Sequence, residues 1–527
     1  MLRQFITTLI IFIFGFQSYN VKSEEAFYSA ASFFAQDTNT YFLHTVERGQ
    51  TVFSISKMYN VSVDDIYRLN PGSQESIPIG GQLRIPQESG SYFYHTIQPQ
   101  ETLYSVSRKY YMKGEDITSV NPGLTVETFT IGKVIRIPTN RVTTPMEGNE
   151  SYNQQITNAL LNPTLRGENI QTIHVALLLP IGLKEGTNVR NAANNRMVEY
   201  YEGFLLALEE LKTKGISVNL QVHDIGSGIS NLPEILKKPA MQNVNLVIGG
   251  FSDNQIKLIA NFAQGRNIPY VIPFSRSDEP LSNHKVYQIN TPPSYLYAKA
   301  SIAFYNKYKN SNIIFHIPNR TGNRMDFIEI LQQDLRSKGV PYKVISTGVL
   351  SAEIQQAIEQ DKNNVFIPND DGSEALLRLI SHLKPLADTN PQLSLSLFGY
   401  PRWQEQSAEY SDDFFRFNVN FYSFFYANPT DPRVRAFYNN YYRWFSREPI
   451  HIFPKYGILG YDTGMYFIQL LHKYGTAYEV NVNNLTYNGI QTDFSFEKVN
   501  NWGGFLNTNL YLIEFKPDFG ITSTRIK

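Results

Sequence analysis

An internal repeat constrains the fold of this chain more than any other feature of its sequence. Residues 44–72 align with residues 95–123 at an offset of 51, and 11 of the 29 aligned positions are identical. The copies share, in order, a His-Thr pair, a threonine, an Asn-Pro-Gly stop and, after one extra residue in the second copy, a final Arg-Ile-Pro. Self-similarity of this kind indicates that one small structural unit occurs twice in succession.

Each copy has the pattern of a strand, two short helices and a strand. In the first copy, residues 42–46 alternate as a strand does, and a helix begins at Thr51 with apolar residues at helical spacing. A second helix is predicted over 63–69, where the Asn-Pro-Gly of 70–72 ends it because proline and glycine continue a helix poorly. Residues 82–85 read as the closing strand.

Both copies resemble LysM domains, which we place at 41–86 and 92–138. The resemblance rests on "HTVERGQTVFSISKMYNVSVDDIYRLNPG…IPIGGQLRIP", with its glycine turn, Asn-Pro stop and final Ile-Gly…Ile-Pro. It implies binding of glycans that contain N-acetylglucosamine, such as peptidoglycan. It further implies a shallow groove formed by Gly49, Gln50, Thr51, Val52, Ile79 and Gly80 in copy one, and by Glu101, Thr102, Leu103, Ile131 and Gly132 in copy two. Copy two departs from the pattern, since Gln100 replaces the turn glycine.

The charge balance of the repeat region suits an uncharged sugar. Residues 41–138 contain nine Lys or Arg and nine Asp or Glu. Backbone amides and hydroxyl groups in a turn can pair with an acetamido group, and two grooves joined by the short 87–91 segment gain from effective concentration. The alternative is that Thr51 and Thr102 only cap their helices.

The first residues have the pattern of an export signal. Arg3 precedes an apolar run over 5–16, which is shorter than the ~20 residues of a membrane span. We predict a signal peptide over 1–23, cleaved after Ser23, with an uncleaved signal anchor as the alternative. The mature chain is then expected in the periplasm or cell envelope, associated with the wall and without a membrane span.

The remainder of the chain predicts a polar linker over 139–172 and a large α/β region over 173–527. The clearest unit is a strand over 244–248, a helix capped by Ser252 or Asp253, and a strand over 268–272. The same rhythm recurs along the region, which predicts a mostly parallel, doubly wound sheet. Because 355 residues exceed one compact core, two lobes are expected.

This large region resembles type I periplasmic binding proteins, the Leu/Ile/Val-receptor fold. The resemblance rests on "IHVALLLPIG", "VNLVIGGFSDNQIKLIANFAQGRNIPYVIPFS" and "GILGYDTGMYFIQLLHKYG". It implies a ligand between the lobes, near Ser252, Ser275, Tyr461 and Asp462. The alternative is that these side chains cap helices, shape turns or pack internally. No pair of hydroxyl residues with an acidic partner suits the amino group of a free amino acid.

An aromatic cluster over 400–426 lies within this region, in a chain of which 14% is aromatic. Two readings remain open for it. The cluster is either core packing or a contact surface for a glycan or a protein, because Tyr and Trp combine an apolar face with a polar tip.

Several kinds of chemistry are absent from the sequence. No cysteine occurs, which excludes a thiol hydrolase, a cysteine zinc site and a lipoprotein anchor, and the net charge of zero speaks against nucleic acid. No nucleophile elbow, His-Glu-x-x-His helix or phosphate loop is found, so we predict no catalytic residue, metal or cofactor.

The expected function is that of a non-enzymatic envelope protein that binds peptidoglycan. Its large region would present a small-ligand site or a protein surface as a sensor or scaffold. The alternatives are a solute-binding protein of the ABC-transporter type and, as the weakest, a hydrolase that uses two distant carboxylates.

Overall fold

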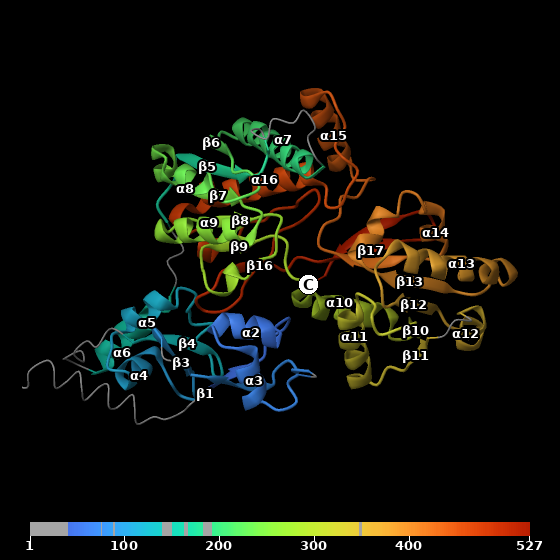
Figure 1. Cartoon of the computed structure of the whole chain (residues 1–527), viewed down its shortest axis with the longest axis horizontal. Helices are drawn as coiled ribbons and strands as arrows, with labels where there is room; N and C mark the ends of the chain where they lie inside the picture. Colours follow the sequence, from blue (N-terminus) through green and yellow to red (C-terminus); the bar gives the residue numbers. More distant parts are fainter. Residues whose placement is uncertain are drawn as a thin grey trace, which may run out of the picture.

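The fold is known from a computed structural model, which describes residues 41–74, 76–87, 90–139, 150–162, 167–182, 192–346 and 350–526. The predicted signal peptide over 1–23 lies outside the described residues. Figure 1 shows three bodies: the two copies of the repeat at lower left, one α/β lobe above them and a second lobe to the right. Among the described residues, none of the helices has the length and apolar character that crossing a membrane requires.

Each repeat forms the predicted βααβ unit. In copy one, β1 and β2 pair antiparallel and enclose two helices; the elements are β1 (Tyr41–Thr45), α2 (Val52–Tyr59), α3 (Val63–Leu69) and β2 (Gln82–Pro86). Copy two repeats this with β3 (Tyr92–Thr96), α4 (Leu103–Lys109), α5 (Gly114–Val120) and β4 (Val134–Pro138).

The Asn-Pro-Gly stop of each copy does more than end a helix. Asn70 follows α3, and its side-chain amide accepts from the backbone N–H of Arg84 and donates to the Arg84 carbonyl, both at 2.8 Å. Asn121 makes the same pair of bonds to Arg136 in copy two. This shared asparagine therefore ties the second helix to the closing strand, which explains its place in the repeat.

Lobe 1 is a seven-stranded, mostly parallel sheet. Its strands are β5 (Thr172–Leu179), β6 (Ser217–Asp224), β7 (Leu246–Gly249), β8 (Tyr270–Ile272), β9 (Val286–Gln288), β15 (Phe496–Lys498) and β16 (Phe505–Asn507), in the order β15-β16-β9-β8-β7-β5-β6. Only β15 and β16 pair antiparallel. The chain thus returns to lobe 1 near its C-terminal end, where it adds β15 and β16 to the sheet.

Helices cover both faces of the lobe 1 sheet. Alternate residues of β5 enter two separate cores, Val175 and Leu177 one of them, Ala176 and Leu178 the other. The first core is closed by α7 (Ala192–Thr213) and α16 (Tyr456–Tyr474), and the second by α8 (Leu232–Lys237) and α9 (Asp253–Gly265). The apolar run of β5 follows from burial on both faces.

Lobe 2 is a second seven-stranded sheet with the order β11-β10-β12-β13-β14-β17-β18. Its strands are β10 (Asn312–His316), β11 (Tyr342–Ile345), β12 (Asn364–Pro368), β13 (Leu395–Gly399), β14 (Asn420–Ser423), β17 (Tyr511–Phe515) and β18 (Ile521–Arg525). Its helices are α10 (Ser294–Tyr308), α11 (Met325–Ser337), α12 (Leu350–Ala357), α13 (Ser373–Thr389) and α14 (Ser411–Arg416). The two-lobed α/β prediction is confirmed, with antiparallel strands added at the end of the chain.

The aromatic cluster over 400–426 is core packing for most of its members. Tyr400 and Trp403 are fully buried, and the Tyr400 hydroxyl donates to the Pro368 carbonyl at 2.5 Å. Phe421 and Tyr422 of β14 lie in the same core. The aromatic cluster over 400–426 therefore goes largely into the core of lobe 2 rather than into an exposed surface.

The 139–172 segment, predicted as a polar linker, is attached to its neighbours where it is described. Helix α6 (Glu150–Ala159) packs on copy two so closely that a Cβ at Gly114 would stand 2.5 Å from Thr157. Leu161 is buried in the core of copy two. Further on, the backbone N–H of Glu168 donates to the Thr476 hydroxyl of lobe 1 at 2.9 Å.

Candidate functional site

In copy one, the two loops predicted to form the groove lie side by side. The N–H of Gly80 donates to the Val46 carbonyl, and the N–H of Val46 donates to the Gly81 carbonyl, each at 2.8 Å. Thr51 and Gly80 are exposed, and the Ile79 side chain is 62% exposed. The two loops thus present backbone peptide groups with the exposed Thr51 and the aliphatic side chain of Ile79 beside them.

Copy two builds the same arrangement although Gln100 replaces the turn glycine. Gln100 adopts φ 67°, in the left-handed region that Gly49 occupies in copy one with φ 81°. The N–H of Gly132 donates to the Ile97 carbonyl at 2.9 Å, and Ile131 is 67% exposed. The departure from the repeat therefore changes a side chain and leaves the course of the backbone intact.

Several predicted groove residues have structural partners of their own. The Thr51 and Thr102 hydroxyls accept from the N–H groups of Ser54 and Ser105 at 3.1 Å, which caps α2 and α4. The side chains of Val52 and Leu103 are buried in the cores of their copies. These four residues can offer their backbone to a ligand, and the two isoleucines are the exposed large apolar side chains of the predicted grooves.

Gln50 and Glu101 occupy equivalent positions and hold the first strand of their copy. The Gln50 side-chain oxygen accepts from the N–H of Glu47 at 2.8 Å and lies 2.7 Å from His44 Nε2. Glu101 makes the same contacts to Gln98 and His95, the latter at 2.6 Å. Sequence reasoning placed both in the groove and missed the histidines, although the repeated His-Thr pair was a signal for them.

Electrostatics distinguishes the two copies at this position. Burial lowers the pKa of His44 and of His95. Burial opposes ionisation of Glu101, but hydrogen bonds from the Gln98 N–H and His95, together with the charge of Lys109, hold the pKa of Glu101 below its usual value. Copy two therefore carries a partly buried negative charge, that of Glu101, at the position where copy one has the neutral Gln50.

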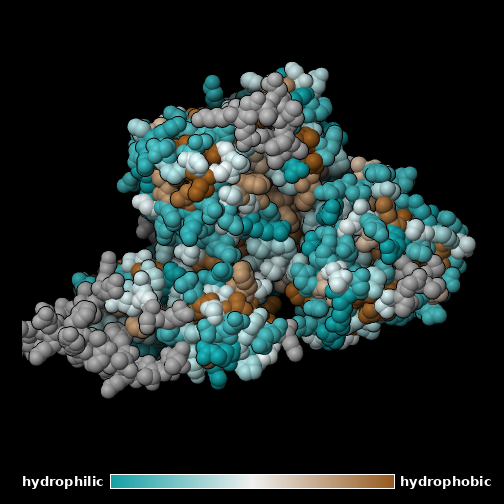
Figure 2. Space-filling model, viewed as in Figure 1, coloured by the Kyte–Doolittle hydropathy of each residue, from teal (hydrophilic) through white to brown (hydrophobic). Residues whose placement is uncertain are grey.

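A loop from lobe 1 is inserted between the two copies. We call residues 499–504, which join β15 to β16, the wedge loop. Its Trp502 is 2% exposed, with ring centroids 5.9 Å from Tyr59 and 5.8 Å from Tyr94, and the Arg136 guanidinium lies 4.5 Å from the Trp502 ring centroid. The space-filling view shows apolar residues gathered where the copies meet lobe 1 (Figure 2).

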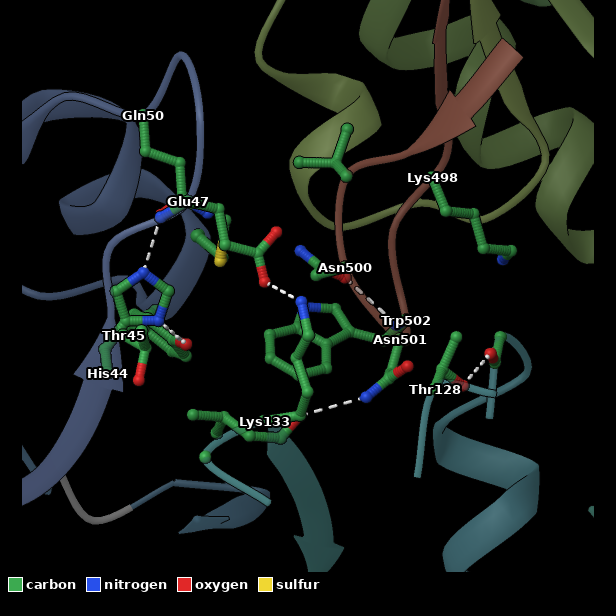
Figure 3. A pocket seen from close by; sticks show the side chains of 16 residues that line it. His44, Thr45, Glu47, Gln50, Thr128, Lys133, Lys498, Asn500, Asn501 and Trp502 are labelled. Carbon is green, nitrogen blue, oxygen red and sulfur yellow. Dashed lines mark hydrogen bonds and ion pairs between the residues drawn. The ribbon is translucent and has the colours of Figure 1, made fainter. Parts of the chain in front are cut away.

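Hydrogen bonds complete this contact. The N–H of Gly123 donates to the Asn501 carbonyl at 2.7 Å, and the Asn501 side chain donates to the Val134 carbonyl at 3.2 Å (Figure 3). A cavity of about 100 Å³ remains between the copies and the wedge loop. It is well below the several hundred Å³ of ligand pockets, so a sugar does not fit there.

Of the four residues predicted between the lobes, the structure brings Ser252 and Ser275 together. Both follow the carboxyl ends of the adjacent parallel strands β7 and β8. Ser252 caps α9 by accepting from the N–H of Gln255, and the Ser275 hydroxyl donates to the Phe251 carbonyl at 2.5 Å. Their contacts match the capping and turn roles that formed the alternative prediction, and a ligand role for them stays a prediction.

Tyr461 and Asp462 lie on α16 and contact other parts of lobe 1. The Tyr461 hydroxyl donates to Glu210 of α7. Asp462 is fully buried and accepts from the Tyr487 hydroxyl at 2.7 Å and from the N–H groups of residues 490, 491 and 492. Burial raises the pKa of Asp462 to about 6 despite these donors. The contacts of Asp462 organise the 487–492 segment, and that of Tyr461 joins α16 to α7.

Sequence reasoning did not anticipate a hollow of about 550 Å³ on the outside of lobe 1. It is lined by α7, α16, the 486–490 segment and α15 (Pro432–Phe445), and Tyr461 is one of its walls. Its charged groups have partners within the chain, such as Arg433 with Asp431 and Glu210 with Lys214. Across the described part of the chain, no group of three or more acidic or histidine side chains could hold a metal ion.

Comparisons with known proteins identify the repeat. A family model for the LysM domain matches residues 44–86 and 95–138, so the chain contains two LysM domains. The proposed sporulation-specific glycosylase YdhD of Bacillus subtilis (strain 168) is 33% identical over 97 residues. That match covers 18% of this chain, and the chain spans 22% of the length of the relative.

Solved structures similar to the two lobes include substrate-binding proteins of ABC transporters. One is a proposed branched-chain amino acid transporter from Rhodospirillum rubrum, with 13% identity and a TM-score of 0.49. Another is a protein from Desulfitobacterium hafniense in complex with Leu, with 13% identity and a TM-score of 0.40. Each match covers 67% of this chain and 99% of the other.

Proposed function

We propose that this protein is a non-enzymatic, exported cell-envelope protein that binds peptidoglycan through its LysM pair. The observation that carries the proposal is the repeated groove. Each copy places an exposed isoleucine, Ile79 or Ile131, beside two loops that are held together by backbone hydrogen bonds. The loops offer peptide groups and the isoleucine offers an apolar surface.

A neutral amino sugar suits such a surface. Its acetamido group can exchange hydrogen bonds with backbone amides, while the apolar face of its ring packs on an aliphatic side chain. The LysM region has nine basic and nine acidic residues, so long-range attraction to a charged ligand plays little part. One shallow groove of this kind binds weakly, and a second groove on the same glycan strand raises the overall affinity.

We propose that the two-lobed region acts as a sensor or scaffold beside the wall. It would recognise a small ligand near Ser252 and Ser275 or an envelope protein. The wedge loop supports this arrangement, since it holds the LysM pair against lobe 1, and lobes held to a glycan-bound LysM pair would lie beside the wall. A diffusing solute receptor of the ABC-transporter type, the second candidate, has no need of a wall tether.

Co-sedimentation with purified sacculi tests glycan binding. The full chain is the right material, because the LysM core contains lobe 1 residues such as Trp502 and Leu281. We expect Ile79→Ser combined with Ile131→Ser to lower the bound fraction at least several-fold at physiological salt. Val344→Ser is the matched control, an apolar residue of the lobe 2 edge strand that is 49% exposed. Failure of the unaltered chain to sediment would exclude the proposal.

A thermal-shift screen of amino acids, muropeptides and sugars distinguishes the candidates for the two lobes. A shift with a free amino acid or another small solute favours the solute receptor. Shifts with muropeptides alone, or capture of a wall-synthesis enzyme without any small-molecule shift, favour the sensor or scaffold. Clearing of peptidoglycan in a zymogram would contradict the non-enzymatic assignment.

A further inference from the structure

The turn of copy one lies where lobe 1 passes into lobe 2. Helix α10 is the first helix of lobe 2 and follows β9 of lobe 1, with Tyr295 in its first turn. A Cβ at Gly49 would collide with the Cα of Tyr295 and would stand 2.9 Å from two carbons of the ring. The backbone of Gly49 therefore rests directly on Tyr295.

The charge of Arg48 in the same turn also acts on another connection between the lobes. Lys299 of α10 donates to Glu497 of β15 and to the Thr508 carbonyl, at 3.0 and 3.1 Å. Thr508 directly follows β16, on the way to β17 of lobe 2. Burial opposes ionisation of Glu497, but Thr508, Lys299 and the positive charge of Arg48 hold the pKa of Glu497 below its usual value. Arg48, next to Gly49, is thus part of this charge cluster.

Copy one is meanwhile anchored to lobe 1 by its own core. Leu281, Val499, Trp502 and Leu506 of lobe 1 belong to the same apolar cluster as Val52 and Ile55 of α2. In Figure 1, α2 lies next to the start of α10, below the junction of the two lobes. Copy one therefore contacts lobe 1 through a core, and it contacts α10 of lobe 2 through Tyr295, which packs against that core and lies on the backbone of Gly49.

We propose that copy one is a latch on the hinge between the lobes, and that glycan in its groove releases the latch by competing with Tyr295 for the Gly49 turn. This inference rests on the proposed glycan binding. Lobes joined by a few chain segments move by hinge rotation, and the described strand order gives three such connections. A ligand shifts such an equilibrium only if it binds one state better than the other.

Competition supplies that difference in affinity. Gly49 is part of the predicted groove, and the face of Gly49 where a Cβ would stand is occupied by Tyr295. Sugar and tyrosine cannot contact this face together. By linkage, glycan weakens the Gly49–Tyr295 contact by the same factor by which the contact weakens glycan binding. The exposed Ile79 and Gly80 remain open to a first encounter with the glycan.

The absence of cysteine allows a direct measurement of the lobes. Asn261→Cys on α9 and Glu329→Cys on α11 are both at exposed positions and can carry spin labels for distance measurement by pulsed electron resonance. We expect the tetramer of N-acetylglucosamine to shift the interlobe distance distribution of the full chain. Tyr295→Ala should show the shifted distribution without glycan and should bind the tetramer about fivefold more tightly or better.

Two controls separate the latch from general disturbance. Tyr305→Ala removes another half-buried tyrosine of α10 and should leave both readouts unchanged. Gly49→Ala and Gly80→Ala share the backbone strain of φ 81° and 80°, but a Cβ at Gly80 meets nothing within 4 Å. Only Gly49→Ala should shift the interlobe distance without glycan.

The outcomes are distinct. Glycan binding with an unchanged distance distribution, and equal affinity in Tyr295→Ala, would overturn the latch and leave the proposed function standing. Absence of tetramer binding in every variant, with sacculi also unbound, would overturn the proposed function and the latch with it.

Discussion

At the scale of single residues, the two LysM domains differ in charge at the equivalent positions Gln50 and Glu101. Both side chains brace the first strand through a histidine and a backbone N–H. Because the folded pKa of Glu101 lies below its usual value, the folded state holds fewer protons than the unfolded state near that pH. The contribution of Glu101 to stability is present above the unfolded pKa of about 4.3 and is lost as the pH falls through the folded pKa.

Replacing this charge should flatten the acid dependence of copy two. Glu101→Gln reproduces the neutral residue of copy one, so we expect a smaller loss of stability than in the unaltered chain between about pH 5 and pH 3. Urea unfolding midpoints of the full chain across that range measure the difference. Glu115→Gln, at an exposed position of α5, is the control. Parallel curves for the unaltered chain and Glu101→Gln would contradict the assignment.

At the scale of elements, helix α16 is joined to a distant segment by a single carboxylate. Asp462 receives three backbone N–H groups and one hydroxyl from residues 487–492, which precede β15. A buried acceptor with four donors is costly to remove, because the donors are then left without partners. Asp462 therefore has a sufficient structural role within α16, whatever its relation to a ligand.

Asp462→Asn tests this role of the helix. The amide nitrogen cannot accept from the N–H groups of residues 491 and 492, so we expect the free energy of unfolding to fall by about 2–3 kcal/mol. Chemical denaturation measures the change, with Asp412→Asn at an exposed position of α14 as the control. A loss below about 0.5 kcal/mol, the range of ordinary surface substitutions, would contradict the structural role.

At the scale of the whole molecule, the wedge loop decides how the LysM pair is held. Trp502 packs against both Tyr59 of copy one and Tyr94 of copy two, whose rings also contact each other, while its own strands belong to lobe 1. The two copies and a loop far from them in sequence thus share one apolar contact. The unfolding of the LysM pair and of lobe 1 is expected to be cooperative for this reason.

Trp502→Ala should uncouple the unfolding of the LysM pair from the unfolding of lobe 1. We expect a loss of about 3–5 kcal/mol and a distinct, lower-temperature transition for the LysM pair in calorimetry, because the indole leaves a cavity between the copies. Small-angle scattering should show a larger radius of gyration. Trp444→Ala, at a position that is 55% exposed on α15, is the matched control. A single transition at nearly unchanged temperature would show that the wedge loop does not couple these regions.

Local patterns in the sequence were sufficient for the elements and for part of the candidate site. Helix starts at Thr51 and Ser252 could be predicted because a cap is an interaction over three residues. The buried strand β5 could be predicted because its apolar run requires cover on both faces. The packing of α6 on copy two could not be predicted, since nothing in residues 150–159 specifies which neighbour their buried positions face.

The sequence by itself therefore determined the two LysM units and the parallel βα rhythm, because periodicity, caps and breakers act over a few residues, and the length of the α/β region indicated two lobes. Only the tertiary structure decided that Trp502 lies beside Tyr59, that Gly49 rests on Tyr295 and that Asp462 holds the 487–492 segment. These contacts join residues tens to hundreds of positions apart. Their pairing depends on how complementary surfaces pack together, which no local pattern records.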